Sequence, residues 1–280
     1  MADFRFIEAF YSLQGEGLHV GVPSVFVRLF GCNFTCQGFG MPRGEVSNEY
    51  LQLDPKQYTS LDQVPLVRTG CDSFVAWDPR WKHLTKDMSA AELASHLTNL
   101  TPDNNWGDGD IHLVITGGEP LLGWQKNYIK LFEQKAMSHL WDVTFETNTT
   151  QPLHPELRRA IWDQTHGIRY TFSCSPKLSV SGEKWDQAIR PDIARAYNDV
   201  ADHMYFKFVV ASKEDIDEVE AAVAEYASAG VNVPVYLMPV GGCKEEYEQN
   251  MRLVANEALA RGYRYSPRLH VDIWGNQWAT

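Results

Sequence analysis

The feature that most constrains the fold is an alternation of short apolar segments with helical ones. Seven apolar runs are bounded by turn residues, which is the pattern of strands buried on both faces. Helical patterns lie between most of these runs, so we expect a largely parallel sheet with helices outside it. The expected strands are 24–29, 112–115, 142–146, 169–172, 205–210, 234–238 and 269–273.

Capping signals mark where several helices begin. Ser89 starts a capping box ahead of a helix over 90–97, and Ser212 starts another in a segment that Gly230 ends. Six or seven strand–helix units are too few for a closed eight-fold barrel. We therefore expect an α/β fold in the form of a partial (open) parallel β/α barrel, with chemical groups at the carboxyl ends of the strands. The other expected helices are about 125–140, 155–162 and about 245–261.

Composition narrows the class of protein. The chain has 280 residues and a formal net charge of −11, and no basic run stands out. Nucleic-acid-binding proteins usually carry a basic face, so we expect a small-molecule substrate and no direct nucleic-acid binding. The first ten residues lack the apolar core of a secretory signal, and no stretch is apolar enough for a membrane span. A cytoplasmic protein made of one domain over 1–280 is the expectation.

Two cysteines follow the first expected strand, and a third lies far downstream. Cys32 and Cys36 are separated by three residues, and the next cysteine, Cys71, follows a glycine- and proline-containing segment over about 37–70. That segment has weak periodicity and is expected to be a long loop. Clustered cysteines in a chain without a secretory signal favour metal ligands over disulfides. A structural pair and a zinc site remain open, as does Cys174 as the third ligand, whereas Cys243 is expected to be an ordinary thiol.

Segments along nearly the whole chain resemble the 7-carboxy-7-deazaguanine synthases of the radical S-adenosylmethionine (SAM) superfamily. They include 13–17, Cys71-Asp72-Ser73, the Gly-Gly-Glu-Pro at 117–120, 146–148 and 175–178. The usual Cys-x3-Cys-x2-Cys motif is broken because Phe39 stands where its third cysteine belongs. The resemblance therefore implies that 37–70 is an insertion inside the motif, in an open barrel of the radical SAM type. It further implies that Cys32, Cys36 and Cys71 hold a [4Fe–4S] cluster.

The resemblance also assigns roles to residues around that cluster. Arg28 suits a substrate carboxylate, because a planar guanidinium can bind it with two hydrogen bonds. Ser73 is the implied Mg²⁺ ligand. The implied substrate-binding residues are Leu13, Gln14, Gly15, Glu16, Arg28 and Thr116. The implied cofactor-binding residues are Gly70, Asp72, Gly118, Glu119, Glu146, Asn148, Ser175, Pro176, Lys177, Met238 and Pro239.

The activity implied by the resemblance is conversion of 6-carboxy-5,6,7,8-tetrahydropterin to 7-carboxy-7-deazaguanine and ammonia. It implies SAM, a [4Fe–4S] cluster and Mg²⁺ as cofactors, an electron donor such as flavodoxin, and a homodimer. Two alternatives stay open. One is another radical SAM enzyme, such as a glycyl-radical activating enzyme. The other is a non-catalytic binding module stabilised by zinc, although four ligands are hard to assemble from these cysteines.

Overall fold

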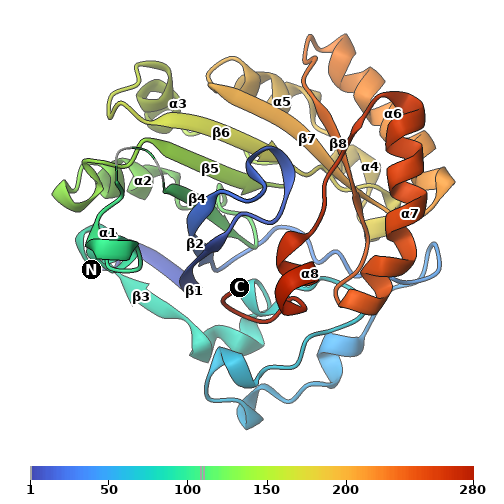
Figure 1. The fold of residues 1–280 in the computed structure, drawn as a ribbon, viewed down its shortest axis with the longest axis horizontal. Coiled ribbons are helices and arrows are strands. Elements are labelled where there is room, and N and C mark those ends of the chain that lie inside the picture. The colour runs from blue at the N-terminus through green and yellow to red at the C-terminus, as the bar shows by residue number, and fades with distance from the viewer. Residues whose placement is uncertain (1, 108, 110) are drawn as a thin grey trace.

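The computed structural model describes residues 2–107, 109 and 111–280, and its strands form one open sheet (Figure 1). The strand order is β3-β1-β2-β4-β5-β6-β7-β8-β9, and pairing is parallel from β2 through β9. The predicted open parallel sheet is thus confirmed. The strands are β1 (Phe4–Leu13), β2 (Pro23–Leu29), β3 (Lys86–Met88), β4 (His112–Gly117), β5 (Asp142–Thr147), β6 (Arg169–Cys174), β7 (His203–Val210), β8 (Val235–Pro239) and β9 (Arg264–Tyr265).

Helices cover the outer face of this sheet. Figure 1 shows α1 to α3 outside one half of the strands and α5 to α7 outside the other. The main core lies between the two layers, where the buried side chains of strands and helices form one continuous cluster. The helices are α1 (Ala90–Thr98), α2 (Gln125–Phe132), α3 (Pro155–Trp162), α4 (Trp185–Ala188), α5 (Pro191–Asn198), α6 (Lys213–Ser228), α7 (Lys244–Arg261) and α8 (Leu269–Trp274).

The helix starts predicted from capping residues are confirmed. At the start of α1, the Ser89 hydroxyl accepts from the Glu92 amide at 3.3 Å, and the Glu92 carboxylate accepts from the Ser89 amide at 2.8 Å. Ser212 and Asp215 make the same reciprocal pair at the start of α6. The helix expected over 125–140 is shorter, because α2 ends at Phe132 and a 3-10 turn follows.

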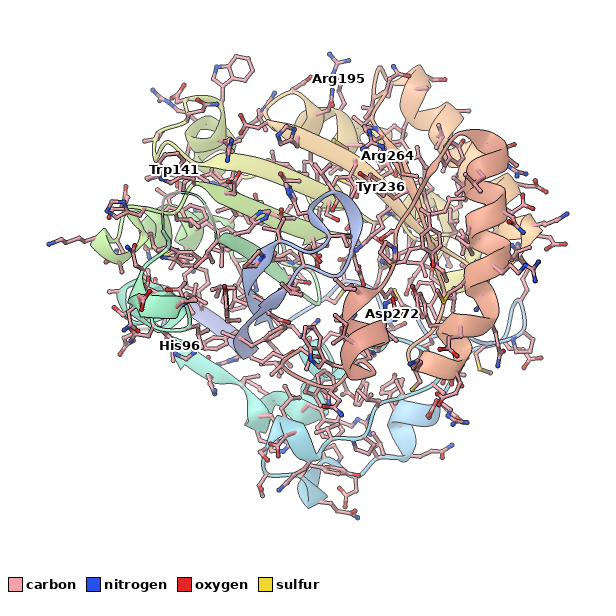
Figure 2. The ribbon with its side chains drawn as sticks, in the orientation of Figure 1. His96, Trp141, Arg195, Tyr236, Arg264 and Asp272 are labelled. Carbon is pink, nitrogen blue, oxygen red and sulfur yellow. The ribbon has the colours of Figure 1, made fainter. Side chains whose placement is uncertain are left out.

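One predicted strand is wrong. Residues 269–273, a short run in which apolar and polar side chains alternate, were expected to form a strand, but they belong to helix α8. The sheet edge is occupied by β9 instead, where the Arg264 guanidinium donates to the Tyr236 hydroxyl at 2.8 Å (Figure 2). Within α8, Val271 is the buried residue while Ile273 is half exposed, which suits one face of a short helix.

The sequence patterns also missed β1, which pairs with β2 in an antiparallel hairpin, and the short edge strands β3 and β9. Helices α4 and α5, between β6 and β7, were not expected either. Within the described residues, no helix combines the length and apolar character that a bilayer crossing requires.

The segment over 37–70 is irregular, as predicted, and contains only 3-10 turns. It still has a core of its own, because Tyr50, Val64 and Val67 pack against residues that follow Cys71, including the fully buried Trp81. Figure 1 shows this segment in light blue at the end of the molecule where α8 and the last residues of the chain lie. The insertion is therefore a folded part of the protein.

Buried histidine at the opposite, amino end of the strands makes stability depend on pH. His112 starts β4, is 2% exposed, hydrogen-bonds Thr144 and meets the His19 ring edge to face. Burial and the neighbouring His19 lower the pKa of His112 to about 3, with Asp142 opposing and Arg169 reinforcing the shift. Only the unfolded chain therefore gains a proton on this side chain as the pH falls below its ordinary value.

We expect the free energy of unfolding to fall between pH 6.5 and about pH 3, with His112 contributing up to about 1.4 kcal/mol per pH unit. His112→Gln keeps a group that can hydrogen-bond Thr144 but cannot titrate, so its profile should be flatter. Denaturant unfolding across this range measures both. Parallel profiles for the two proteins would contradict the assignment.

Candidate active site

A cavity of about 250 Å³ opens at the carboxyl ends of the parallel strands. Nearly every residue that the sequence predicted for the site lines it. The exceptions are Glu119 and Pro176. The predicted residues on its wall are Leu13, Gln14, Gly15, Glu16, Arg28, Cys32, Cys36, Gly70, Cys71, Asp72, Ser73, Thr116, Gly118, Glu146, Asn148, Ser175, Lys177, Met238 and Pro239.

The three predicted cluster ligands lie together on one side of this cavity. Cys36 is buried beside Phe34, and both Cys32 and Cys71 pack against this group. The insertion therefore returns Cys71 to the loop that carries the other two cysteines. Cys174 and Cys243 do not line the cavity: the first is buried in β6, and the second contacts the Val67 carbonyl in the insertion.

The three thiols do not by themselves form a site for a single metal ion. Within 2–107, 109 and 111–280, no three His, Cys, Asp or Glu side chains converge closely enough to hold a single metal ion. A four-iron cube does not need that convergence, since each thiolate binds a different iron. Burial raises the pKa of Cys32 to about 12 and of Cys71 to about 11, so the metal-free thiols stay protonated at neutral pH.

The Gly-Gly-Glu-Pro motif packs directly on the cysteine loop. The Gly118 amide donates to the Leu29 carbonyl at 3.2 Å, and the Glu119 amide donates to the Gly31 carbonyl at 2.7 Å. A Cβ atom on Gly118 would lie 2.8 Å from the Cβ of Cys32 and would collide with the Gly31 carbonyl. Glycine is therefore required where β4 ends, because the backbone there touches the loop that bears the first cysteine.

Glu119 lies behind the cavity wall rather than on it. Its fully buried carboxylate accepts hydrogen bonds from the Leu121 amide, the Thr147 hydroxyl and the Asn148 amide at 2.7 to 3.0 Å. Burial raises its pKa to about 7 although these three donors act in the opposite direction. The Asn148 side chain in turn donates to Asn33 in the cysteine loop at 2.9 Å. Glu119 thus joins the ends of β4 and β5 behind the thiols.

Charged side chains from distant parts of the chain form a network in the cavity wall. The Glu16 carboxylate pairs with Lys207 on β7 and lies 3.2 Å from the Arg268 guanidinium. Arg268 also binds Asp72 at 2.7 Å, which connects this network to the residue after Cys71. Burial opposes ionisation of Glu16, but the cations Lys207 and Arg268 outweigh it and hold its pKa below the usual range.

Arg28 has partners that the sequence did not reveal. Its Nε donates to the Glu8 carboxylate at 2.8 Å, and its Nη1 donates to the Ser73 hydroxyl at 3.0 Å. Its Nη2 makes no hydrogen bond to any residue that the structure describes, and Arg28 lines the cavity. This leaves N–H groups of a half-buried guanidinium available to an anionic oxygen.

Several lining residues had no role predicted from the sequence. Lys207, Arg268 and His270 line the cavity, and only their spatial proximity to Glu16 shows their part in the charge network. Burial and Arg268 lower the pKa of His270 to about 4, so its ring is neutral at pH 7. Residues 276–280 also line the cavity, and no pattern in the sequence indicates this.

Comparison with known proteins agrees with this geometry. No protein-family model matches the sequence. The chain is 30% identical over 275 residues to the 7-carboxy-7-deazaguanine synthase of Pyrobaculum aerophilum, covering 97% of this chain and 95% of that protein. It is also 30% identical over 278 residues to the synthase of Halobacterium salinarum, covering 96% and 90%.

The solved crystal structure of QueE from Escherichia coli shares the fold. It matches with a TM-score of 0.55 and 20% sequence identity, covering 95% of this chain and 94% of that chain. Sequence likeness covers 95% of the Pyrobaculum aerophilum protein and 90% of the Halobacterium salinarum protein. The chain belongs to the 7-carboxy-7-deazaguanine synthase family.

Proposed function

We propose that this protein is a radical SAM enzyme that converts 6-carboxy-5,6,7,8-tetrahydropterin to 7-carboxy-7-deazaguanine and ammonia. Family membership supports this function. The single observation that carries it is the meeting of Cys32, Cys36 and Cys71 at one cavity, although 34 residues separate the last two in sequence. Three thiols and a network of charged side chains in one cavity suit a cluster with one open iron and a polar, anionic substrate.

The residues present fit the cofactors of this family. Cys32, Cys36 and Cys71 would hold a [4Fe–4S] cluster, and the backbone at Gly118 is close enough to the cysteine loop to bind a ligand of that cluster. Lys177 donates to Ser175 at 3.1 Å on the same wall, where it would face the carboxylate of SAM. When bound, the cluster and SAM supply the radical chemistry.

The charged side of the cavity would hold and orient the substrate. The free N–H groups of Arg28 suit its carboxylate, and Glu16, kept ionised by Lys207 and Arg268, can accept from the N–H groups of a pterin ring. Gln14 donates to Glu146 at 3.2 Å, which ties the end of β1 to the end of β5. These groups would fix the ring relative to the thiols and keep water out of the site.

We also propose Mg²⁺ at Ser73, an electron donor such as flavodoxin, a homodimer, a cytoplasmic location and a single domain with an insertion at about 37–70. The Ser73 hydroxyl lies 3.2 Å from the Asp72 carboxylate, and both line the cavity, so two oxygens are available to a hard cation. The insertion surrounds the return to Cys71, and we propose that it covers the site or contacts the electron donor.

Anaerobic incubation of the reconstituted protein with SAM, a reductant and the carboxy-tetrahydropterin tests the reaction. We expect 7-carboxy-7-deazaguanine and ammonia by mass and chemical analysis. Cleavage of SAM without conversion of the pterin would instead favour a different radical SAM reaction. A colourless protein that retains zinc after anaerobic purification would favour the binding-module alternative.

Removing the displaced cysteine tests the ligand set. Cys71→Ala should reduce iron and sulfide after reconstitution to background, because one thiolate of the three is lost. Cys174→Ala and Cys243→Ala should keep wild-type iron, since neither side chain lines the cavity. Full iron and SAM cleavage in Cys71→Ala would overturn the assignment.

Ser73 variants test the magnesium site. Ser73→Ala removes a proposed ligand oxygen, so the stimulation of kcat/KM by Mg²⁺ should fall by about tenfold or more while iron content stays unchanged. Ser73→Thr keeps the hydroxyl and serves as the matched control. Equal stimulation of all three proteins by Mg²⁺ would argue against metal binding at this residue.

A further inference from the structure

The loop that carries Cys36 is held by one carboxylate oxygen from a distant segment. Oε1 of Glu183 accepts hydrogen bonds from the backbone amides of Thr35 and Cys36, each at 2.8 Å. Glu183 follows the turn after β6 and is separated from Cys36 by more than half the chain. Nothing in the resemblance or the local sequence pattern singles it out.

The backbone of Cys36 needs such support. Its φ angle is 49°, in the left-handed region that L-amino acids other than glycine and asparagine rarely adopt. The neighbouring Gly38 donates to the Ser181 carbonyl at 2.8 Å, and a Cβ atom on Gly38 would lie 2.8 Å from the Val180 carbonyl. The cysteine loop is therefore pressed against the segment over 180–183, and Glu183 hydrogen-bonds it at the strained residue.

A second carboxylate holds the chain where the insertion returns. Oε2 of Glu49 accepts from the Arg68 amide at 3.0 Å, the Thr69 amide at 2.9 Å and the Thr69 hydroxyl at 2.8 Å. The next amide, that of Gly70, donates to the Phe39 carbonyl at 2.7 Å. The last of these hydrogen bonds is made by Gly70, directly before Cys71. Together they hold the backbone of Cys71 near the loop that carries Cys36.

We propose that Glu183 and Glu49 are positioning residues for the iron–sulfur cluster, which fix the backbones bearing Cys36 and Cys71. The proposal rests on the proposed function, because it assumes that these thiols bind a cluster. In both cases a single oxygen accepts all the main bonds. Each backbone segment therefore needs a hydrogen-bond acceptor at the end of a side chain as long as that of glutamate. The negative charge is not required. Glutamine can replace either residue, whereas alanine and the shorter aspartate cannot.

The experiment compares Glu183→Ala, Glu183→Asp and Glu183→Gln, with Glu49→Ala and Glu49→Gln as the second series. Iron and sulfide per chain are measured after reconstitution at limiting iron, together with the electron paramagnetic resonance spectrum of the reduced cluster. Thermal unfolding of each metal-free protein reports on the fold independently. Glu92→Ala is the matched control, because Glu92 also accepts from a backbone amide but lies at the start of α1, outside the cavity.

We expect Glu183→Ala, Glu183→Asp and Glu49→Ala to bind iron less well by about tenfold or more, as for residues that orient metal ligands. The two glutamine variants and Glu92→Ala should match the wild type in iron content and spectrum. If Glu183→Ala unfolds the protein, Glu183→Asp and Glu183→Gln decide, because only the glutamine side chain is long enough to reach the amides of Thr35 and Cys36.

Wild-type iron and spectra in both alanine variants would overturn the proposal. So would a loss of iron in the glutamine variants, since charge would then be the requirement. Iron content is read without substrate, so this result is independent of which reaction the enzyme performs. A wild-type protein that never assembles a cluster would refute the proposed function itself, and a cluster-bearing protein that makes no deazaguanine would leave the positioning test intact.

Discussion

The hydrogen bond from the Gly70 amide to the Phe39 carbonyl closes the long insertion, and the candidate active site depends on that closure. Between these two residues the chain places Tyr50, Val64 and Val67 in a small apolar core that is completed by residues after Cys71, such as Trp81. Loop-closure entropy rises slowly with length, so an insertion of this size can be tolerated if its ends are held. The apolar core of the insertion and the hydrogen bond between its two ends stabilise it in this way.

A second constraint joins the thiols to the sheet. The backbone at Gly118 touches Gly31 and Cys32 so closely that a side chain is excluded. Glu119 then connects the ends of β4 and β5 through Thr147 and Asn148. The cysteine loop is consequently fixed to rigid strand ends on one side and to the segment over 180–183 on the other. Rigid support of this kind is what a site needs to hold reacting groups at a set distance.

Much of this could be predicted from the sequence because the signals are local. Strands buried on both faces are short apolar runs, and capping boxes mark α1 and α6 within a few residues. Cys71 could be assigned because the residues around it keep a family pattern despite the insertion. The alternation at 269–273 misled because a short helix with one buried residue and an edge strand share that pattern.

The rest of the site could not be predicted because it depends on partners far apart in the chain. Glu16 and Arg268 are 252 positions apart, and Glu183 reaches the cysteine loop from 147 positions away. No periodicity or motif connects such pairs. The charge network and the support of the cysteine loop therefore become visible only when the strand ends are placed side by side.

The most direct test of the central claim is a crystal structure of the anaerobically reconstituted protein, with iron located by anomalous scattering. We predict one four-iron cluster bonded to the sulfurs of Cys32, Cys36 and Cys71, with a fourth iron that has no protein ligand. A cluster bonded to Cys174 or Cys243, or a Cys71 sulfur out of bonding distance, would contradict the account.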